Sequence, residues 1–241
     1  MKCCLWGFIP LVLVGCGEPS GQIIAKIPEA SGISYCSNSD TLIVANDEGS
    51  YYEISKEGKI LHQIKLGNYD FEGIVCEEDT LIFALENQGL LMVDRKTGVT
   101  KTILVDESYQ GKKLSLFGKK AGVEGIAKVD NMVYLAKQSK KKKESFIAVV
   151  KLMPYPSLII DVVDHHIADT AGLSYHEGYL YMVSDKEDLL IKYDLQKKET
   201  LQKVKLGEGA WEGIALDGKG NVYLADDDGR VLKYKKKALG L

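Results

Sequence analysis

The chain has 241 residues, of which 45% are hydrophobic and 27% are charged, a balance typical of a soluble globular domain. This composition excludes a disordered or collagen-like chain, and the absence of a long apolar run after residue 16 excludes a protein with several membrane-spanning helices. The formal net charge of -3 gives no overall attraction for nucleic acid, so we expect no nucleic-acid partner.

The first sixteen residues predict export and lipid anchoring. Lys2 precedes an apolar stretch over residues 3–14, which is too short for a mature membrane span and is typical of a signal-peptide core. The stretch ends in Leu13-Val14-Gly15-Cys16, which resembles the lipobox of bacterial lipoproteins. We expect residues 1–15 to be a signal peptide, Cys16 to be acylated, and residues 16–21 to tether the protein to a membrane of the bacterial cell envelope, periplasmic or surface-exposed. The alternative is an ordinary signal peptide with a chance cysteine.

Five similar segments follow along the rest of the chain. Each starts with a residue, a glycine and an aliphatic residue, and the glycines are 41, 52, 47 and 41 residues apart. Two further β-rich runs follow each start, and the first four segments have one more. Four strands per segment predict an all-β fold, a five-bladed β-propeller with four-stranded blades, as one domain over residues 22–241. The five starts are Ser31-Gly32-Ile33, Glu72-Gly73-Ile74, Glu124-Gly125-Ile126, Ala171-Gly172-Leu173 and Glu212-Gly213-Ile214.

The two ends of this repeat array are complementary. The fifth segment has no fourth run, whereas a β-rich run over residues 22–27 stands alone before the first start. We predict that this N-terminal strand completes the last blade and closes the ring, because closure removes exposed strand edges.

Two stretches break the regularity of the repeats. Residues 106–121 are expected to form a long linking loop, and residues 140–143, four lysines, are expected in a solvated hairpin, with contact to acidic lipid or polysaccharide as the alternative.

Cys36 and Cys76 are the cysteines left after Cys3, Cys4 and Cys16 are assigned to the signal and anchor. They fall near equivalent strand ends in neighbouring segments. An envelope compartment permits a disulfide between them. We favour two buried, unreactive thiols and keep the disulfide as the alternative.

One face of the predicted ring gathers polar residues from every segment. The first strand of a propeller blade lines the channel and the second runs back antiparallel, so first-strand starts and second-strand ends meet at one face. The inner set is Ser31, Glu72, Glu124, Ala171 and Glu212. The outer set is Asn46 and Asp47, Glu86 and Asn87, Lys137 and Gln138, Ser184 and Asp185, and Asp226 and Asp227. We therefore expect the functional site at this face.

The negative charges of the inner-set glutamates would repel one another unless they were neutralised. A pair of like charges 4 Å apart costs roughly 4 kcal/mol at an effective dielectric constant of 20. Either some carboxyls stay protonated with raised pKa values, or a cation lies among them. Because the candidate ligands are all oxygens, one Ca²⁺ ion in the channel is the favoured occupant, ahead of Mg²⁺, which needs a tight octahedron. The alternatives are sodium, water, or glutamates that merely accept backbone N–H hydrogen bonds.

Other candidate chemistry is weaker. His165 and His166, flanked by Asp164 and Asp169, suggest a transition-metal site or a general base. Adjacent side chains diverge, however, so we expect both histidines to have structural roles. The sequence contains no nucleophile elbow, phosphate-binding glycine loop or zinc-site spacing.

The set of repeat motifs resembles the SdiA-regulated family of bacterial β-propellers. The matching phrases span residues 22–236 and include EASGISY (29–35), DFEGIV (70–75), GVEGIA (122–127), DTAGLSYHEGYLYMVSDK (169–186) and AWEGIALDGKGNVYLADD (210–227). The resemblance implies an envelope propeller tied to calcium and distantly similar to phytases. The ring order also resembles the calcium-activated nucleotidases, which implies Ser31, Glu72, Glu124 and Glu212 as metal ligands. Ala171 departs from that pattern, because such rings tend to have serine there.

Two functions remain open from the sequence. The first is an envelope-anchored, calcium-binding propeller that acts as a binding or sensing module, a monomer whose partner is an envelope protein. The second is a calcium-dependent phosphohydrolase of phytase or nucleotidase type, with a phosphate-containing small molecule as substrate. In the second, Asp185, Asp226 or Glu86 would be the base, and Lys137 or Lys186 would hold phosphate. The chain has two arginines, Arg95 and Arg230, and both fall in third strands, which favours the binding module.

Overall fold

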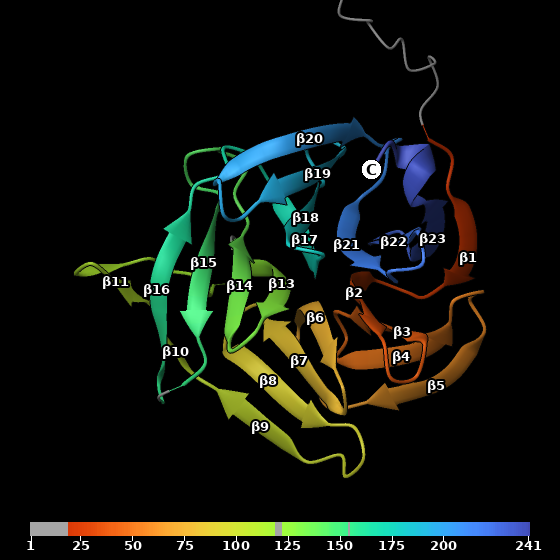
Figure 1. Ribbon diagram of the computed structural model, residues 1–241. Helices are drawn as coiled ribbons and strands as arrows, with labels where there is room; N and C mark the ends of the chain where they lie inside the picture. Colours follow the sequence, from red (N-terminus) through yellow and green to blue (C-terminus); the bar gives the residue numbers. More distant parts are fainter. Residues whose placement is uncertain (1–18, 119–121, 154) are drawn as a thin grey trace, which may run out of the picture.

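The computed structural model describes residues 19–118, 122–153 and 155–241, which form a five-bladed β-propeller (Figure 1). The predicted signal peptide, Cys16 and the tether up to residue 18 lie outside the described residues. In the described ranges no helix has the length and hydropathy that crossing a membrane requires. The strands are β2 (Ala30–Cys36), β3 (Thr41–Asn46), β4 (Ser50–Ser55) and β5 (Ile60–Lys65) in blade 1; β6 (Phe71–Glu77), β7 (Thr80–Leu85), β8 (Gly89–Asp94) and β9 (Thr100–Ile103) in blade 2; β13 (Val123–Val129), β14 (Met132–Lys137), β15 (Phe146–Lys151) and β16 (Ser157–Val163) in blade 3; β17 (Thr170–His176), β18 (Tyr179–Ser184), β19 (Leu189–Asp194) and β20 (Glu199–Lys205) in blade 4; β21 (Trp211–Leu216), β22 (Asn221–Asp226) and β23 (Arg230–Lys235) in blade 5.

The ring closes as the sequence predicts. Strand β1 (Gln22–Lys26) pairs antiparallel with β23, with Gln22 opposite Lys233 and Lys26 opposite Arg230. Just beyond the strand, Ile27 donates its backbone N–H to the carbonyl of Gly229 at 2.8 Å. The outer strand of the last blade therefore comes from the start of the chain (Figure 1). The chain leaves blade 5 through a short 3₁₀ helix, η1 (Lys236–Leu239).

The stretch over residues 106–121 differs from the expected plain loop. Strand β10 (Val105–Asp106) runs parallel to β16 and adds a fifth strand to blade 3. A hairpin of β11 (Ser108–Tyr109) and β12 (Lys112–Lys113) follows. This segment covers part of the outer edge of blade 3, which is otherwise left unpaired. The four lysines at 140–143 lie, as expected, in the connection between β14 and β15.

Side-chain burial explains the sequence pattern of each blade. The middle strands are buried on both faces: β3 is buried along its whole length and β18 along all but its first residue. The outer strand β20 instead alternates between exposed and half-buried positions, because one of its faces meets solvent. Five apolar clusters lie between the blades, and each combines side chains of two neighbouring blades. The blades are therefore joined around the ring by apolar packing.

The repeated glycine exists because neighbouring inner strands nearly touch. A Cβ atom added to Gly32 would lie 2.9 Å from Gly73 Cα, and one added to Gly213 would lie 2.8 Å from the backbone nitrogen of Ile33. The motif glycines Gly73, Gly125 and Gly172 face the next inner strand in the same way. Any side chain at these positions would push the inner strands apart. This contact brings the residue before each glycine close to the channel axis.

Cys36 and Cys76 form a disulfide, which corrects the favoured prediction of two free thiols. The correction has a geometric cause. Both residues lie near the ends of adjacent inner strands, and their Cα atoms are 5.3 Å apart, inside the range that a disulfide spans. The close approach of the inner strands therefore carries the sulfur atoms into bonding distance at the end of the ring opposite the motif glycines.

Candidate functional site

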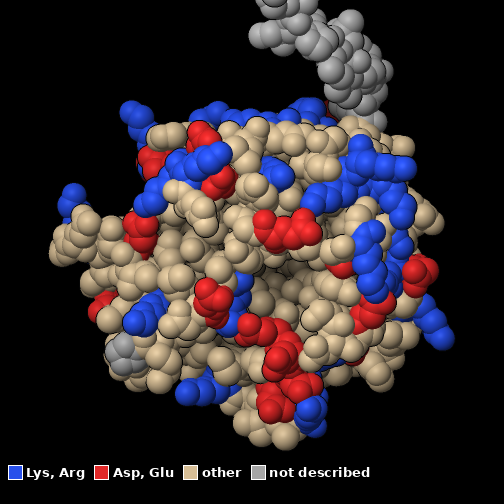
Figure 2. All heavy atoms as spheres, in the orientation of Figure 1, with Lys and Arg blue, Asp and Glu red and all other residues tan. Residues whose placement is uncertain are grey.

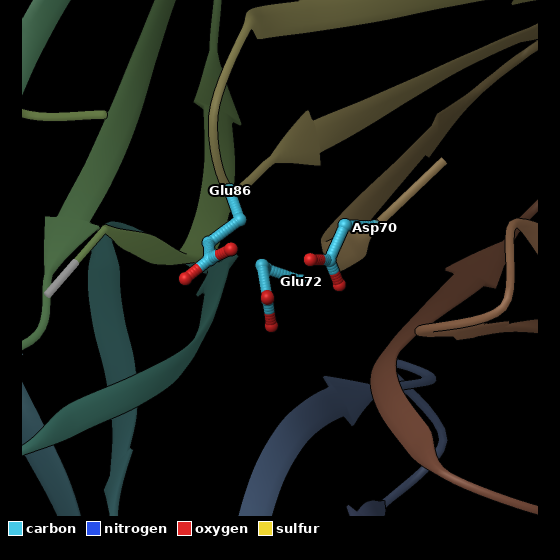
Figure 3. Close-up of side chains that lie close together, drawn as sticks. All are labelled: Asp70, Glu72 and Glu86. Carbon is cyan, nitrogen blue, oxygen red and sulfur yellow. The ribbon is translucent and has the colours of Figure 1, made fainter. Parts of the chain in front are cut away.

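Acidic side chains converge where the inner strands begin. The carboxylates of Asp70, Glu72 and Glu86 come within 4.8 Å of one another (Figure 3). A hydrogen bond also joins the carboxyls of Glu72 and Glu124. Glu212 lies close enough to Glu124 for the charge of Glu124 to raise its pKa. The structure thus brings together the three glutamates of the predicted inner set. It also adds Asp70, which the sequence analysis did not single out.

The electrostatics of this acidic mouth, as we call the channel opening around Glu72, Glu124 and Glu212, are dominated by burial. Burial raises the pKa of Glu72 far above its usual range, and the neighbouring charges of Glu124 and Asp47 add to the rise. Burial likewise raises the pKa values of Glu124 and Glu212. Burial raises the pKa of Asp47 to about 7, helped by the charge of Asp227. Without a cation, burial therefore favours the protonated form of each of these carboxyls.

In the described structure these glutamates lack the usual partners of buried carboxylates, which are backbone N–H groups and basic side chains. Across the residues that the structure describes, Glu72, Glu124 and Glu212 accept no hydrogen bond from a backbone N–H and form no ion pair with a lysine or arginine. The alternative in which each glutamate caps backbone donors is therefore not the arrangement observed. Two further oxygens at this end, Ser31 Oγ and Asp47 Oδ1, are also buried, and the Ser31 hydroxyl interacts with the Asp47 carboxyl and opposes the rise in its pKa.

A repeated backbone hydrogen bond places the outer set. In each blade, the residue that follows the second strand donates its N–H to a carbonyl two residues before the inner-set residue. These bonds run from Asp47 to Glu29 (3.4 Å), Glu86 to Asp70 (3.3 Å), Gln138 to Gly122 (3.0 Å), Asp185 to Asp169 (3.2 Å) and Asp227 to Ala210 (3.0 Å). The outer set is thereby tied to the start of the inner strand in every blade.

In blades 1 and 5 the first residue of the outer-set pair bonds within its own hairpin. Asn46 is buried and accepts the N–H of Ser50 at 2.9 Å. Asp226 is fully buried and forms an ion pair with Arg230 at 2.7 Å. Asn46 and Asp226 therefore stabilise turns. Asn87 instead donates to the Glu86 carboxylate at 2.8 Å, next to the acidic mouth.

Positive charge lies on one side of the mouth. Lys186 Nζ donates to the carbonyl of Lys140 at 2.8 Å, which joins the hairpins of blades 3 and 4. Burial raises the pKa of Asp169, and the nearby charges of Lys140 and Lys186 oppose the rise. Lys137, at the end of β14, lies 5.9 Å from the ring centre of Phe146. Within the described chain none of these three ammonium groups has a carboxylate partner at ion-pair distance.

The two histidines diverge as expected. His165 is buried, and its Nδ1 accepts the backbone N–H of Ile167 at 3.1 Å. Burial lowers the pKa of His165 to about 4, so the ring is neutral at neutral pH. His166 is exposed and lies 3.0 Å from the carboxylate of Asp164. His165 therefore stabilises its loop, and His166 faces solvent.

Comparison with known proteins agrees with this architecture. The family model described as SdiA-regulated matches residues 20–230. Among solved structures, the chain is similar to the glutaminyl cyclase of Myxococcus xanthus, with a TM-score of 0.65 and 12% sequence identity over 89% of this chain and 95% of that chain. At this identity the similarity concerns the fold. No curated protein matches the sequence significantly.

Proposed function

The chain belongs to the SdiA-regulated family, and we propose that it is a calcium-binding β-propeller that acts as a binding or sensing module on the bacterial cell envelope. One observation carries the calcium proposal. Glu72, Glu124 and Glu212, of which Glu124 is buried and the other two are half-buried, converge in a site that offers them neither backbone donors nor a basic side chain in the described structure. Buried carboxylates without such partners are destabilising unless a proton or a cation neutralises them.

The donor set fits calcium. Besides the three glutamates, Ser31 Oγ and Asp47 Oδ1 are buried oxygens at this end of the channel, and the Ser31 hydroxyl opposes the rise in the pKa of Asp47. Calcium accepts 6–8 oxygen ligands in irregular geometry, and a five-fold ring with one alanine position offers that kind of set. Water would complete the shell at Ala171. A bound calcium ion would neutralise the carboxylates and present positive charge to a ligand at the acidic mouth.

The envelope location rests on the sequence alone. The lipobox-like Leu13-Val14-Gly15-Cys16 supports acylation of Cys16. Strand β1 begins at Gln22, a few residues after that cysteine, so a lipid anchor would hold the propeller close to the membrane. We infer a monomer that presents its mouth to an envelope protein or to a soluble ligand.

Thermal unfolding tests the calcium proposal. The mature chain from residue 16, carrying Cys16→Ser, is melted in chelator and then with calcium or magnesium. An ion at 100 times its dissociation constant stabilises by about 2.7 kcal/mol, or about 5–10 °C for a chain of this size. Glu72→Gln removes a buried ionisable carboxyl, so it should raise the Tm in chelator and reduce the rise that calcium causes.

Glu78→Gln is the matched control, because Glu78 lies in the exposed turn between β6 and β7 at the other end of the ring. It should leave both melting temperatures unchanged. A calcium-specific rise that Glu72→Gln removes supports the proposal. No rise in a chain that mass spectrometry shows to be free of metal would contradict it, and the search would move to protein partners.

Phosphoester hydrolysis is the second candidate. The observation in its favour is that Lys137, Lys140 and Lys186 stand at the mouth without carboxylate partners in the described structure. Against it, Arg95 is paired with Glu53, and Arg230 with Asp226, so neither arginine is free to clamp a phosphate. Asp226 is also too buried to act as a base, which leaves Asp185 and Glu86.

Hydrolysis of 4-nitrophenyl phosphate by the calcium-loaded protein separates the two functions. If the lysines hold phosphate, Lys140→Ala with Lys186→Ala should lower the rate at least tenfold. Lys112→Ala, a change on the exposed hairpin of blade 3, should have no effect. No turnover above the uncatalysed rate, together with calcium binding, would favour the binding module.

A further inference from the structure

A second cavity lies at the end of the channel opposite the acidic mouth. It has a volume of about 370 Å³ and is lined by residues of all five blades. Its floor consists of one aliphatic side chain from each inner strand, namely Ile33, Ile74, Ile126, Leu173 and Ile214. On the far side of these side chains the channel narrows to a space of about 10 Å³. The cavity and the acidic mouth are therefore separate chambers. The face shown in Figure 2 has a hollow at the centre of the ring.

The wall of this distal cavity, as we call it, is cross-linked. The disulfide between Cys36 and Cys76 joins the inner strands of blades 1 and 2 at its edge. Ser34 Oγ accepts the backbone N–H of Cys76 at 2.9 Å. The Tyr35 hydroxyl donates to Asp40 at 2.7 Å, which holds this lining residue in place. A wall that is already ordered loses little conformational entropy when a ligand binds.

The charged groups that line the distal cavity are satisfied within the protein. Lys128 Nζ lies 2.7 Å from Glu77 Oε1. Asp217 accepts hydrogen bonds from Asn221 at 2.6 Å and from Tyr223 at 3.2 Å. A charged ligand would have to displace these partners, which is unfavourable. The lining therefore selects an uncharged ligand.

Polar groups without a protein partner are also present at this cavity. Ser174 and Tyr175 are among its lining residues, and in the described part of the chain neither side-chain hydroxyl forms a hydrogen bond. Tyr175 is 37% exposed, so part of this residue is accessible to a ligand. The lining thus combines an aliphatic floor, two tyrosines at positions 35 and 175, and hydroxyl-bearing residues. Such a mixture of apolar surface and a few polar groups is typical of small-molecule sites.

We propose that the distal cavity binds an uncharged, ring-bearing small molecule with an apolar end and a hydroxylated end. The apolar end packs against the aliphatic floor, and the ring lies against Tyr35 and Tyr175. The hydroxylated end bonds to the hydroxyls of Ser174 and Tyr175. Because the aliphatic floor separates the two chambers, this binding is independent of the calcium proposed for the acidic mouth.

Saturation-transfer NMR on the mature chain with Cys16→Ser tests this site. The probes are 4-methylphenol and phenyl β-D-glucopyranoside, with phenyl phosphate as the charged comparison. Both neutral probes should receive saturation, and phenyl phosphate should receive at least fivefold less. Ser174→Trp, which fills the cavity, should abolish the signals, and Tyr175→Ala should weaken binding at least fivefold. Tyr155→Ala is the matched control, because Tyr155 is 62% exposed and lies outside the distal cavity.

The outcomes are distinct from those of the calcium test. Signals that persist in chelator and disappear in Ser174→Trp support the distal site, whatever happens to the calcium proposal. Absence of saturation transfer to both neutral probes would overturn it. Equal signals in the parent and in a folded Ser174→Trp variant would also overturn it, as would equal binding of phenyl phosphate. The Tyr175→Ala and Tyr155→Ala pair decides the case if Ser174→Trp fails to fold.

Discussion

Removal of the Cys36–Cys76 disulfide should destabilise the propeller strongly. The bond closes a loop between residues 40 apart in sequence. In the chain-entropy treatment, a loop of that length restricts the unfolded chain by about 4 kcal/mol at 25 °C. For a chain of this size, that energy corresponds to a fall in Tm of about 8–16 °C. The two inner strands already touch through Gly32 and Gly73, so the folded state should change little when the bond is absent.

The assay is denaturant unfolding of the mature chain with Cys16→Ser, compared with the same chain carrying Cys36→Ala and Cys76→Ala. Addition of dithiothreitol should lower the unfolding midpoint of the first protein toward that of the second and leave the second unchanged. Alkylation followed by mass spectrometry checks that the bond is present at the start. Equal midpoints for the oxidised chain and the double variant would refute the reasoning, because the bond would then not restrict the unfolded state.

Three other perturbations have defined outcomes. Gly125→Ala would place a methyl group against the carbonyl oxygen of Ala171 and should cost about 1–3 kcal/mol of unfolding free energy in urea, whereas Gly118→Ala, which has open space, should cost nothing measurable. Burial lowers the pKa of His165 to about 4 in the folded protein, against about 6.5 in the unfolded chain. Between these two pH values only the unfolded chain takes up the proton. The free energy of unfolding therefore falls by about 3 kcal/mol as the pH drops from 6.5 to 4. His165→Asn should remove that part of the pH dependence in urea unfolding, and an unchanged slope would contradict it. Deletion of residues 22–26 should leave blade 5 open and cause concentration-dependent association in sedimentation velocity, and a stable monomer would contradict it.

The propeller architecture was predictable because the five repeats share a recognisable glycine motif in the sequence. The glycine of each start is required by close packing of neighbouring inner strands, so it recurs in all five segments and sets the period. The same argument located the closing strand before the first start. The extra strand β10 was not predictable, because a two-residue pairing leaves no periodic pattern.

The positions of the inner-set residues were predictable from the sequence, but the orientation of the outer set and the contribution of Asp70 were not. Glu72 and its equivalents stand beside the repeated glycine, so one rule places them all. The orientation of the outer-set side chains was not predictable, because the geometry of each turn decides which of two adjacent residues faces the mouth. Asn46, for example, accepts a hydrogen bond from Ser50 within its own hairpin. Asp70 was missed although a carboxylate also occupies the equivalent positions Glu29 and Asp169, a repeated signal two residues before the inner set.

The pairing of β1 with β23 joins the first strand of the domain to the last one in its sheet. During synthesis the chain emerges from its N-terminus, so β1 has no partner until nearly the whole domain has been made. Four blades can assemble in order as they appear, but the ring locks only with the final strand. A chain interrupted before Arg230 would therefore carry an unpaired strand at each end of an open arc. Closure thus acts as a check on synthesis, distinguishing a complete domain from a fragment.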